Sequence, residues 1–304
     1  MRHLLTYLFC LLFIACGPSI QEEKERQRQA KAEDIRRDSL AFKIAVTPTL
    51  DCLPFFLAKE QGIFDALGVD VSLKCKDAQM DCDEAMRSGQ IECRVSDLMR
   101  TELLRKDGVP LQYLGATNAY WQMIGNRKAR IKDIKNLGDK MIAMARYSAT
   151  DYLATLGIDS VKPSNPVFRI QVNDVRVRLM MLLNNEMDAV MLPEPQASLA
   201  RHNNHPVLMD SRDKDIRLGV IAANSSRIAD ARRQQQLSLL IKGYEMACDS
   251  LNEKGLEHYA FIIKKYCRAN DVTVKALPSI TFPHLAPPRQ KDIDRTKSAK
   301  WRTS

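Results

Sequence analysis

Several polar side chains stand directly after short apolar runs, where strands end and helices begin. Ser148 and Thr150 open a segment with helical spacing, and Glu194 follows an apolar run and stands between two prolines. The free N–H groups of a helix N-terminus, together with nearby hydroxyls, suit an anionic or polar ligand group. Ordinary capping of the helix is the alternative role for these hydroxyls, and both roles stay open. A carboxylate such as Glu194 favours an amino or pyrimidine group over a bare oxyanion.

Two further places carry side chains suited to ligand contact. Asp51 and Ser96 follow two other apolar runs, and the aromatic pair at positions 120 and 121 follows a third. An aromatic ring there would stack on a planar or apolar ligand, or would simply pack within the connection between two domains. The candidate ligand-binding set is Asp51, Cys52, Ser96, Tyr120, Trp121, Ser148, Thr150 and Glu194.

Motifs typical of catalysis or of bound cofactors are missing from the sequence. It contains no GxSxG, HExxH, GxGxxG or P-loop pattern. A metal site involving the cysteines with His202 and His205 is the competing idea, but the chain has no CxxC pair and its spacing matches no common zinc module. We therefore predict a protein that is not an enzyme, with no catalytic residue, no metal and no cofactor.

From Phe42 onward, short apolar runs alternate with amphipathic segments, which predicts an α/β fold with largely parallel sheets. Strands are expected at residues 43–47, 69–75, 91–95, 111–117, 140–145, 167–172, 189–192, 207–209 and 218–223. Helices are expected at residues 55–61, 83–88, 98–106, 149–156 and 174–184, and over most of the chain after Ile228.

A helix, a polar turn and a strand occur at residues 85–97 and again at 181–193, which suggests two similar lobes. Chance similarity between βα units is the alternative. Residues 111–125 and 216–224 are extended and would form the connections. We predict two Rossmann-like lobes joined by a two-strand hinge, with lobe I at residues 42–118 plus 220–304 and lobe II at 119–219. Ligands of open α/β sheets bind beyond the carboxyl ends of the strands, so the site is expected in the cleft between the lobes.

The amino terminus is typical of an exported protein. Arg2 and His3 precede a twelve-residue run, apolar apart from one threonine, which is too short to span a bilayer and fits a signal peptide. The following residues resemble a bacterial lipobox, so we expect residues 1–16 to be a lipoprotein signal with lipidated Cys16; an ordinary signal peptide is the alternative. Residues 17–41 form a charged tether. The protein is thus expected on the periplasmic side of a bacterial membrane, anchored by lipid, as a monomer.

The net charge of +9 is spread along the chain, and the export signal argues against nucleic acid as the partner. Six cysteines remain in the body, and an oxidising compartment permits disulfides between them. The pairs nearest in sequence, Cys75 with Cys82 and Cys248 with Cys267, are the expected bridges. Cys52 with Cys93 is an alternative.

A series of motifs carries a family resemblance. These are the segments 53–71 (LPFFLAKEQGIFDALGVDV), 88–89 with 95–97, 108–111, 134–140 and 187–195 (MDAVMLPEP). In this order they resemble the nitrate/sulfonate/taurine and thiamine-precursor group of type II periplasmic binding proteins. The resemblance covers residues 42 to about 211.

The resemblance implies a substrate-binding lipoprotein of an ABC importer, which captures a small polar or anionic solute in its cleft. The solute would be a sulfonate, nitrate, taurine or a pyrimidine precursor of thiamine, and the partners would be a membrane permease and its ATPase. Asp51 resembles the aspartate of the pyrimidine binders, but Cys52 replaces the aromatic residue that usually follows it. A sensor or assembly lipoprotein with the same fold, and more distantly a pyrimidine-synthesis enzyme, are the alternatives.

Overall fold

The computed structural model describes residues 20–299, so the predicted signal peptide and Cys16 lie outside the described residues. The chain divides into two units, which meet between Ala41 and Phe42. In the first unit, helix α2 (Ile20–Leu40) forms over most of the predicted tether. Among the described helices, none is long and apolar enough to cross a membrane.

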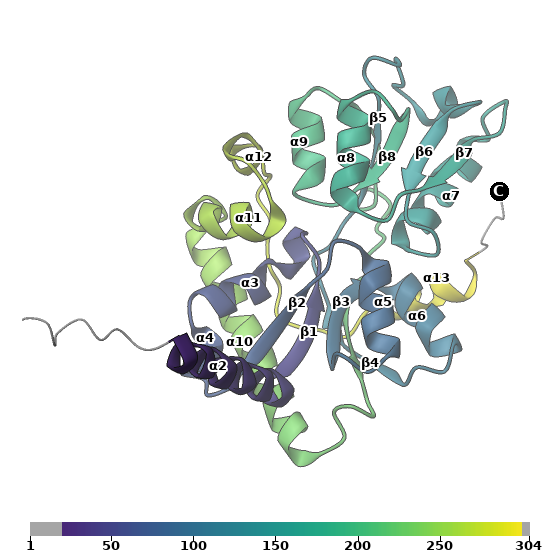
Figure 1. The fold of residues 1–304 in the computed structure, drawn as a ribbon. Coiled ribbons are helices and arrows are strands. Elements are labelled where there is room, and N and C mark those ends of the chain that lie inside the picture. The colour runs from purple at the N-terminus through teal and green to yellow at the C-terminus, as the bar shows by residue number, and fades with distance from the viewer. Residues whose placement is uncertain (1–19, 300–304) are drawn as a thin grey trace, which may run out of the picture. The chain divides into compact units, whose positions relative to one another are not determined.

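The body from Phe42 onward contains two five-stranded sheets (Figure 1). The first has the order β2 (Val71–Cys75), β1 (Phe42–Val46), β3 (Cys93–Asp97), β10 (Gly219–Asn224), β4 (Leu111–Ala116). The second has the order β7 (Phe168–Gln171), β6 (Met141–Met144), β8 (Ala189–Leu192), β5 (Gln122–Gly125), β9 (Val207–Asp210). Lobe I here means the first sheet with the helices packed on it, and lobe II means the second sheet with its helices.

The two sheets share one topology, and this confirms the predicted α/β fold with two Rossmann-like lobes. In each sheet the first three strands in the order pair in parallel, and the fourth, β10 or β5, pairs antiparallel with both of its neighbours. The sheets are therefore mixed, with four of the five strands running in one direction. The antiparallel strand of each sheet is the one that the chain enters after crossing from the other lobe.

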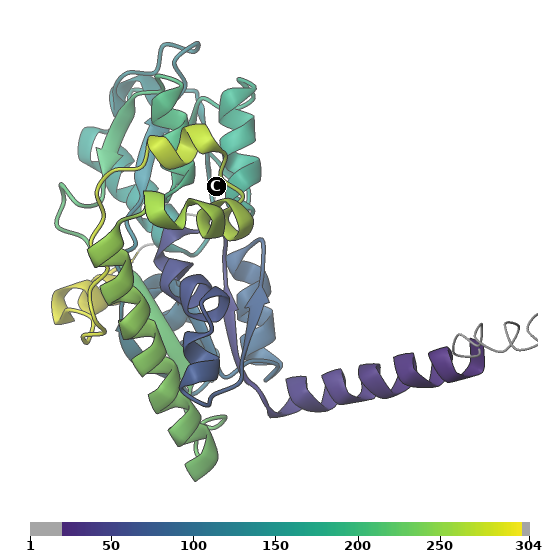
Figure 2. The same cartoon turned by 90° about the vertical axis from the view of Figure 1, so that its left-hand side faces the viewer.

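Helices flank both sheets (Figures 1 and 2). Those of the first half are α3 (Leu53–Glu60), α4 (Ile63–Ala66), α5 (Gln79–Arg87), α6 (Leu98–Lys106) and α7 (Ala149–Val161). Those of the second half are α8 (Val175–Leu183), α9 (Gln196–His202), α10 (Ala231–Lys254), α11 (Ala260–Cys267), α12 (Asp271–Lys275) and α13 (Gln290–Lys297). The sequence analysis did not anticipate α9, and it included β5 only within an extended connection.

Alternation along the strands decides which side chains enter which core. Ile44 packs in the cluster formed with α3 and α10, whereas its neighbour Ala45 packs in the cluster on the α5 side. The same period of two directs Met191 of β8 into one core of lobe II and Val190 into the other. Both faces of each sheet are covered, so the strands read as continuous apolar runs.

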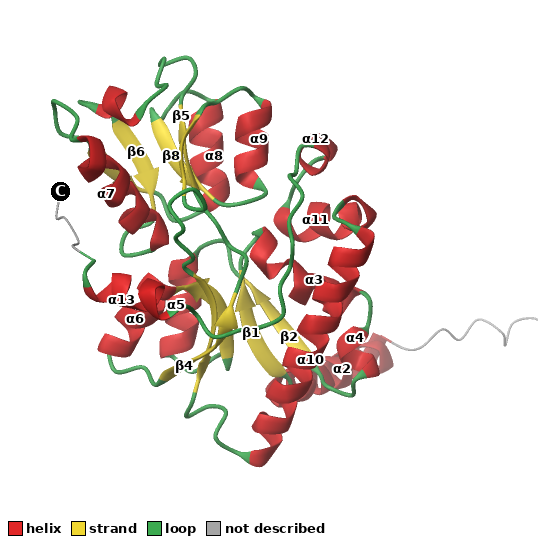
Figure 3. Ribbon diagram, turned by 180° about the vertical axis from the view of Figure 1, so that it is seen from behind, coloured by secondary structure: helices red, strands yellow, loops and turns green. Residues whose placement is uncertain are grey.

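The two crossings between the lobes lie side by side. Thr117 donates its N–H to the carbonyl of Gly219 at 3.0 Å, and Ser211 donates its N–H to the carbonyl of Trp121 at 3.0 Å. The segment after α12 runs past these crossings toward α13 (Figure 3). There Ala286 accepts a hydrogen bond from the backbone of β4 at 2.7 Å. The predicted lobe boundaries, residues 118/119 and 219/220, stay a prediction that these crossings support.

The disulfide predictions are wrong, because all six cysteines of the body are free thiols. Cys82 is buried in the apolar cluster between α5 and β1, while Cys75 is exposed at the end of β2. Cys248 hydrogen bonds with the hydroxyl of Tyr244 on its own helix, and Cys267 is buried in the same core. Each buried thiol therefore serves as a small apolar core residue.

Gly219 provides a test of the close packing at the hinge. A Cβ atom at this position would lie 2.6 Å from Cβ of Ala119 and closer still to Oγ1 of Thr117. We expect Gly219→Ala to lower the free energy of unfolding by about 1–3 kcal/mol because the crossings must separate. Gly138→Ala is the control, since its φ is −55° and its nearest neighbour lies at 3.3 Å. Urea unfolding of both variants makes the comparison, and equal losses would contradict tight hinge packing.

Candidate functional site

A cavity lies between the lobes, at the carboxyl ends of β1, β3, β6 and β8. Its empty volume is about 590 Å³, which includes the space open to solvent. The residues that line it are Thr47, Thr49, Asp51, Asp77, Gln79, Ser96, Asp97, Ala119, Trp121, Ala145, Ser148, Thr150, Asn173, Val175, Arg178 and Pro193.

Five of the eight predicted ligand-binding residues line this cavity: Asp51, Ser96, Trp121, Ser148 and Thr150. The other three, Cys52, Tyr120 and Glu194, do not. Tyr120 and Glu194 line a smaller neighbouring cavity of about 240 Å³, which shares Asp51 with the larger one. The cavity thus lies at the strand ends, where the sequence analysis expected the ligand site. Whether each side chain faces the cavity depends on the hydrogen bonds and packing contacts that the side chain makes.

Glu194 is buried, and its carboxylate is fully hydrogen bonded within the protein. Oε1 accepts from the hydroxyl of Tyr120 at 2.7 Å and from Nη2 of Arg201 at 2.7 Å, and Oε2 accepts from N–H of Ser198 at 3.0 Å. The guanidinium of Arg212 covers the ring of Tyr120 at 3.7 Å. Burial and the nearby carboxylate of Glu194 raise the pKa of this tyrosine. The network holds α9 against the hinge and fixes the carboxylate of Glu194 through contacts within the protein.

Cys52 lies in the apolar core of lobe I rather than at the cavity. Its sulfur accepts a hydrogen bond from N–H of Thr47 at 3.4 Å. Burial raises the pKa of this thiol well above its usual value. The side chain is therefore a neutral core residue that fixes the turn between β1 and α3.

The N-terminus of α7 already binds a carboxylate. Asp97, at the end of β3 in lobe I, accepts hydrogen bonds from N–H of Arg100 at 2.9 Å and from N–H of Ala149 in lobe II. Ser148 Oγ accepts from N–H of Thr150 and donates to the carbonyl of Ala145 at 2.7 Å. Ser148 therefore caps α7, whereas the hydroxyl of Thr150 accepts a hydrogen bond from N–H of Ala145 at 3.0 Å. The place that the sequence suggested for an anionic ligand group is occupied by a side chain of the protein.

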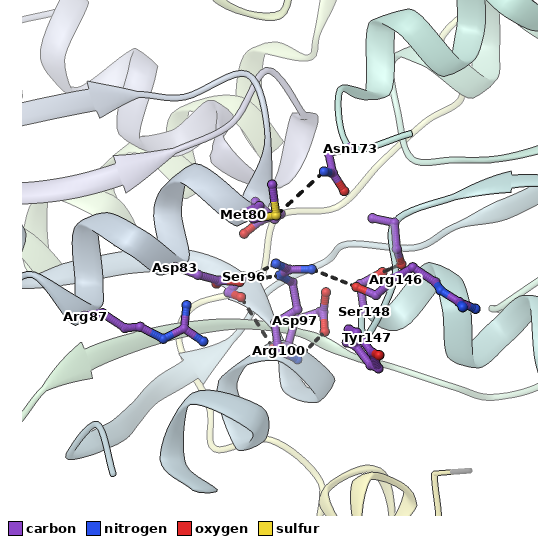
Figure 4. A network of polar contacts seen from close by, with 12 residues as sticks. Met80, Asp83, Arg87, Ser96, Asp97, Arg100, Arg146, Tyr147, Ser148 and Asn173 are labelled. Atoms are coloured by element: carbon purple, nitrogen blue, oxygen red, sulfur yellow. Dashed lines mark hydrogen bonds and ion pairs between the residues drawn. The ribbon is translucent and has the colours of Figure 1, made fainter. Parts of the chain in front are cut away.

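Beneath the cavity lies a buried ionic network that the sequence analysis missed (Figure 4). Asp83 of α5 forms ion pairs with Arg94 of β3 and with Arg100 of α6, and all three side chains are buried. Burial lowers the pKa of Arg94 to about 10, which leaves it charged at neutral pH. Nη2 of Arg94 also donates to Ser96 Oγ at 2.6 Å and to Gln79 Oε1 at 2.8 Å. The network thereby orients two side chains that line the cavity.

Arg178 is the second feature that the sequence analysis did not single out. It stands on α8 between Val175 and Leu182, within the stripe of residues that this helix buries. Its side chain is only 4% exposed and lines the cavity. The sequence did carry a signal for this residue, because Arg178 is a charged residue within the otherwise apolar face of a predicted helix.

Direct contacts close the cleft around the cavity. Arg100 Nη1 of lobe I donates to the carbonyl of Arg146 in lobe II at 2.9 Å. Asp77 and Arg176 form an ion pair across the cleft at 3.0 Å. Backbone N–H of Leu50 donates to the carbonyl of Glu194 at 2.9 Å. The structure therefore represents a state in which the lobes contact each other.

Within residues 20–299, no group of three or more His, Cys, Asp or Glu side chains is placed to hold a metal ion.

The family model described as "NMT1/THI5 like" matches residues 49–250, which include lobe II, the hinge and part of lobe I. The chain belongs to the NMT1/THI5-like family. No curated protein sequence matches it. The predicted family resemblance is thus confirmed at the level of the family.

Solved structures with the same fold are distant in sequence. The alkanesulfonate-binding protein SsuA from Xanthomonas axonopodis pv. citri, bound to MOPS, has a TM-score of 0.69 at 13% identity, over 85% of this chain and 90% of that chain. The periplasmic aliphatic sulphonate-binding protein SsuA from Escherichia coli has a TM-score of 0.66 at 16% identity, over 85% of each chain. The nitrate-binding protein NrtA from Synechocystis PCC 6803 has a TM-score of 0.64 at 13% identity, over 78% of this chain and 68% of that chain. The fold of this NMT1/THI5-like chain is therefore that of the periplasmic binding proteins.

The ionic network beneath the cavity can be tested by removing its shared carboxylate. Asp83→Asn leaves two buried guanidinium groups without their partner, so we expect a loss of about 3–5 kcal/mol in the free energy of unfolding. Asp107→Asn is the matched control, because it breaks the exposed ion pair with Arg87 at 2.8 Å and should cost less than about 1 kcal/mol. Urea unfolding of both variants measures the difference. Similar losses in the two variants would show that the buried network is not a main source of stability.

Proposed function

We propose that this protein is the solute-binding component of an ABC importer, which captures a small polar or anionic solute between its lobes. A membrane permease and its ATPase would then receive the solute. The protein would act as a monomer on the periplasmic side of a bacterial membrane, anchored through a lipid on Cys16. The observation that carries the proposal is the cavity, lined by charged and hydroxyl side chains, at the strand ends of two lobes that share a hinge.

Two features support binding and release by movement of the lobes. The two hinge crossings, at residues 117–121 and 211–219, pair with each other through backbone hydrogen bonds. The contacts across the cleft, such as Asp77 with Arg176, are polar and can form or break as the cleft closes or opens. A solute that contacts both lobes adds interactions that exist only in the closed state. It therefore shifts the population toward the form that we propose the permease recognises.

Binding without chemical conversion is the simpler proposal for this cavity. Cys52 follows the cavity residue Asp51 in the sequence, but its thiol faces the core. Burial raises the pKa of this thiol, so it is a poor nucleophile. Burial raises the pKa of Asp97, and N–H groups of Arg100 and Ala149 hold its carboxyl group in a fixed position at the end of β3. The side chains along the cavity are thus arranged for recognition.

A thermal-shift screen tests the receptor proposal. A ligand that binds only the folded protein stabilises it by mass action, by about 2.7 kcal/mol at 100 times Kd. For a chain of this size we expect the Tm to rise by about 5 °C or more with at least one compound from a panel of sulfonates, nitrate, amino acids and thiamine precursors. No shift across the panel, with a well-folded protein, would contradict the proposal and favour a sensor or assembly role.

A pair of capping variants tests whether the binder occupies this cavity. Ser148→Ala removes the cap of α7 at the cavity, and Asp230→Ala removes the cap of α10 elsewhere, where Asp230 accepts from N–H of Arg233 at 2.9 Å. Each variant should lose about 1 kcal/mol of stability. We expect only Ser148→Ala to weaken binding in isothermal titration calorimetry. Equal affinity in the two variants would place the binding site elsewhere.

A further inference from the structure

Two short segments from opposite lobes meet at one wall of the cavity. Residues 77–80, which lead into α5, belong to lobe I, and residues 173–176, which lead into α8, belong to lobe II. Nδ2 of Asn173 donates to the sulfur of Met80 at 3.7 Å, so the segments touch across the cleft (Figure 4). The members of these segments that line the cavity are Asp77, Gln79, Asn173 and Val175. The two segments, here called the gate, must separate if the lobes move apart on this side.

Four charges of alternating sign run through the gate. Nη2 of Arg176 lies 3.0 Å from Oδ1 of Asp77 and 2.9 Å from Oδ2 of Asp174. Nη2 of Arg268, which belongs to lobe I, lies 3.4 Å from the same Oδ1 of Asp77. The central pair, Asp77 with Arg176, therefore crosses the cleft, and each outer charge contacts the central charge of its own lobe.

The outer charges restrict the side chains of the central pair. Asp174 is the N-cap of α8, and Arg268 directly follows the last residue of α11, so both are attached to helix ends. The main cost of an ion pair near the surface is the entropy lost when two long side chains are held in one geometry. Because each central side chain has a partner in its own lobe, less of this entropy is lost when the gate closes.

The central pair is partly shielded from solvent. The side chain of Arg176 is 27% exposed, and its Nε is buried and makes no hydrogen bond. The side chain of Asp77 is 52% exposed. An ion pair at this depth is weaker than a buried one, and salt screens it. It therefore suits a contact that forms and breaks with small changes in free energy.

We propose that Asp77 acts as a latch: its ion pair with Arg176 forms when the gate closes and shifts the lobes toward the closed state. This inference rests on the proposed receptor function and adds the residue that controls opening. Asp77 is a positioning residue, because it acts through the relative position of the lobes and needs no contact with the solute. Its loss destabilises the closed state, so it speeds release of a solute more than it slows capture.

Pulsed electron resonance on the full chain tests the latch without any solute. Spin labels at Glu84→Cys on α5 and Asn184→Cys after α8 report the distance across the gate, with Ser replacing Cys75 and the two cysteines of residues 1–16; both label sites are exposed. At low ionic strength we expect Asp77→Asn to raise the ratio of long to short distances about two- to fivefold. In 1 M salt, where the Debye length is about 3 Å, the variant and the parent protein should give the same ratio.

Three further variants separate the latch from a general effect on folding. Asp107→Asn breaks an exposed ion pair within lobe I and should leave the ratio unchanged. Arg176→Gln should raise the ratio as Asp77→Asn does, and combining the two should raise it little further, because both remove the same pair. Arg268→Gln should have a smaller effect in the same direction.

Stopped-flow kinetics measure the effect on solute exchange. The probe is 2-aminoethanesulfonate or, if it does not bind, whichever compound of the thermal-shift panel does, and the signal is the fluorescence of Trp121, which lines the cavity. We expect Asp77→Asn to raise the dissociation rate about two- to fivefold and to change the association rate by less than about twofold. Asp107→Asn should change neither rate.

The possible results distinguish the latch from the receptor proposal. An unchanged distance ratio in Asp77→Asn, an equal change in Asp107→Asn, or an effect that persists in 1 M salt would overturn the latch while the receptor function stands. If no compound of the panel binds, the receptor proposal fails, and the distances measured without solute still decide whether this ion pair holds the lobes together.

Discussion

One buried carboxylate, that of Asp83, joins the elements that form the floor of the cavity. It pairs with Arg94 of β3 and with Arg100 of α6, so a strand and two helices depend on a single negative charge. Removing it would leave two guanidinium groups buried without compensation, which is far more costly than losing a surface pair. The network reaches the other lobe, because Arg100 also donates to the carbonyl of Arg146. The geometry of the site and the contact between the lobes thus rest on the same interaction.

The remaining polar groups around the cavity follow from this arrangement. With Arg94 fixed, Ser96 and Gln79 are held by its guanidinium, and Asp97 at the end of β3 meets the N-terminus of α7. The protein thereby uses its own carboxylate to satisfy the helix terminus. Asp51 and Arg178, two further charged side chains that line the cavity, stand on different lobes.

The fold was largely predictable from the sequence because it depends on local alternation. Apolar strands such as 189–192 and buried helices such as α6 agree with their predicted ranges, and the repeated unit around β3 and β8 indicated two lobes. The short strand β5 was missed because its four residues extend directly from a hinge segment. The disulfide predictions failed because spacing in sequence gives no information on burial, and each thiol packs in its own apolar environment.

The site was predictable in place but not in detail. Strand ends pointed to the cleft, but the orientation of Glu194 depends on Tyr120 and Arg201, which stand 74 and 7 residues away in the sequence. No local pattern reveals such partners. Arg178 and Arg94 did leave a local signal, since each interrupts a buried helical or strand face. A charged residue in such a position indicates either a buried ionic network or a ligand.

The central claim, that a solute is enclosed between two moving lobes, is tested most directly by a distance measured across the cleft. Spin labels at Glu84→Cys on α5 and Met180→Cys on α8, with Ser at Cys10, Cys16 and Cys75, report that distance by pulsed electron resonance; both label sites are exposed. We expect a broad distribution that includes longer distances without solute, and a single shorter distance at saturating 2-aminoethanesulfonate or another binder from the screen. Identical distributions, with binding verified by calorimetry, would contradict closure of the lobes around the solute.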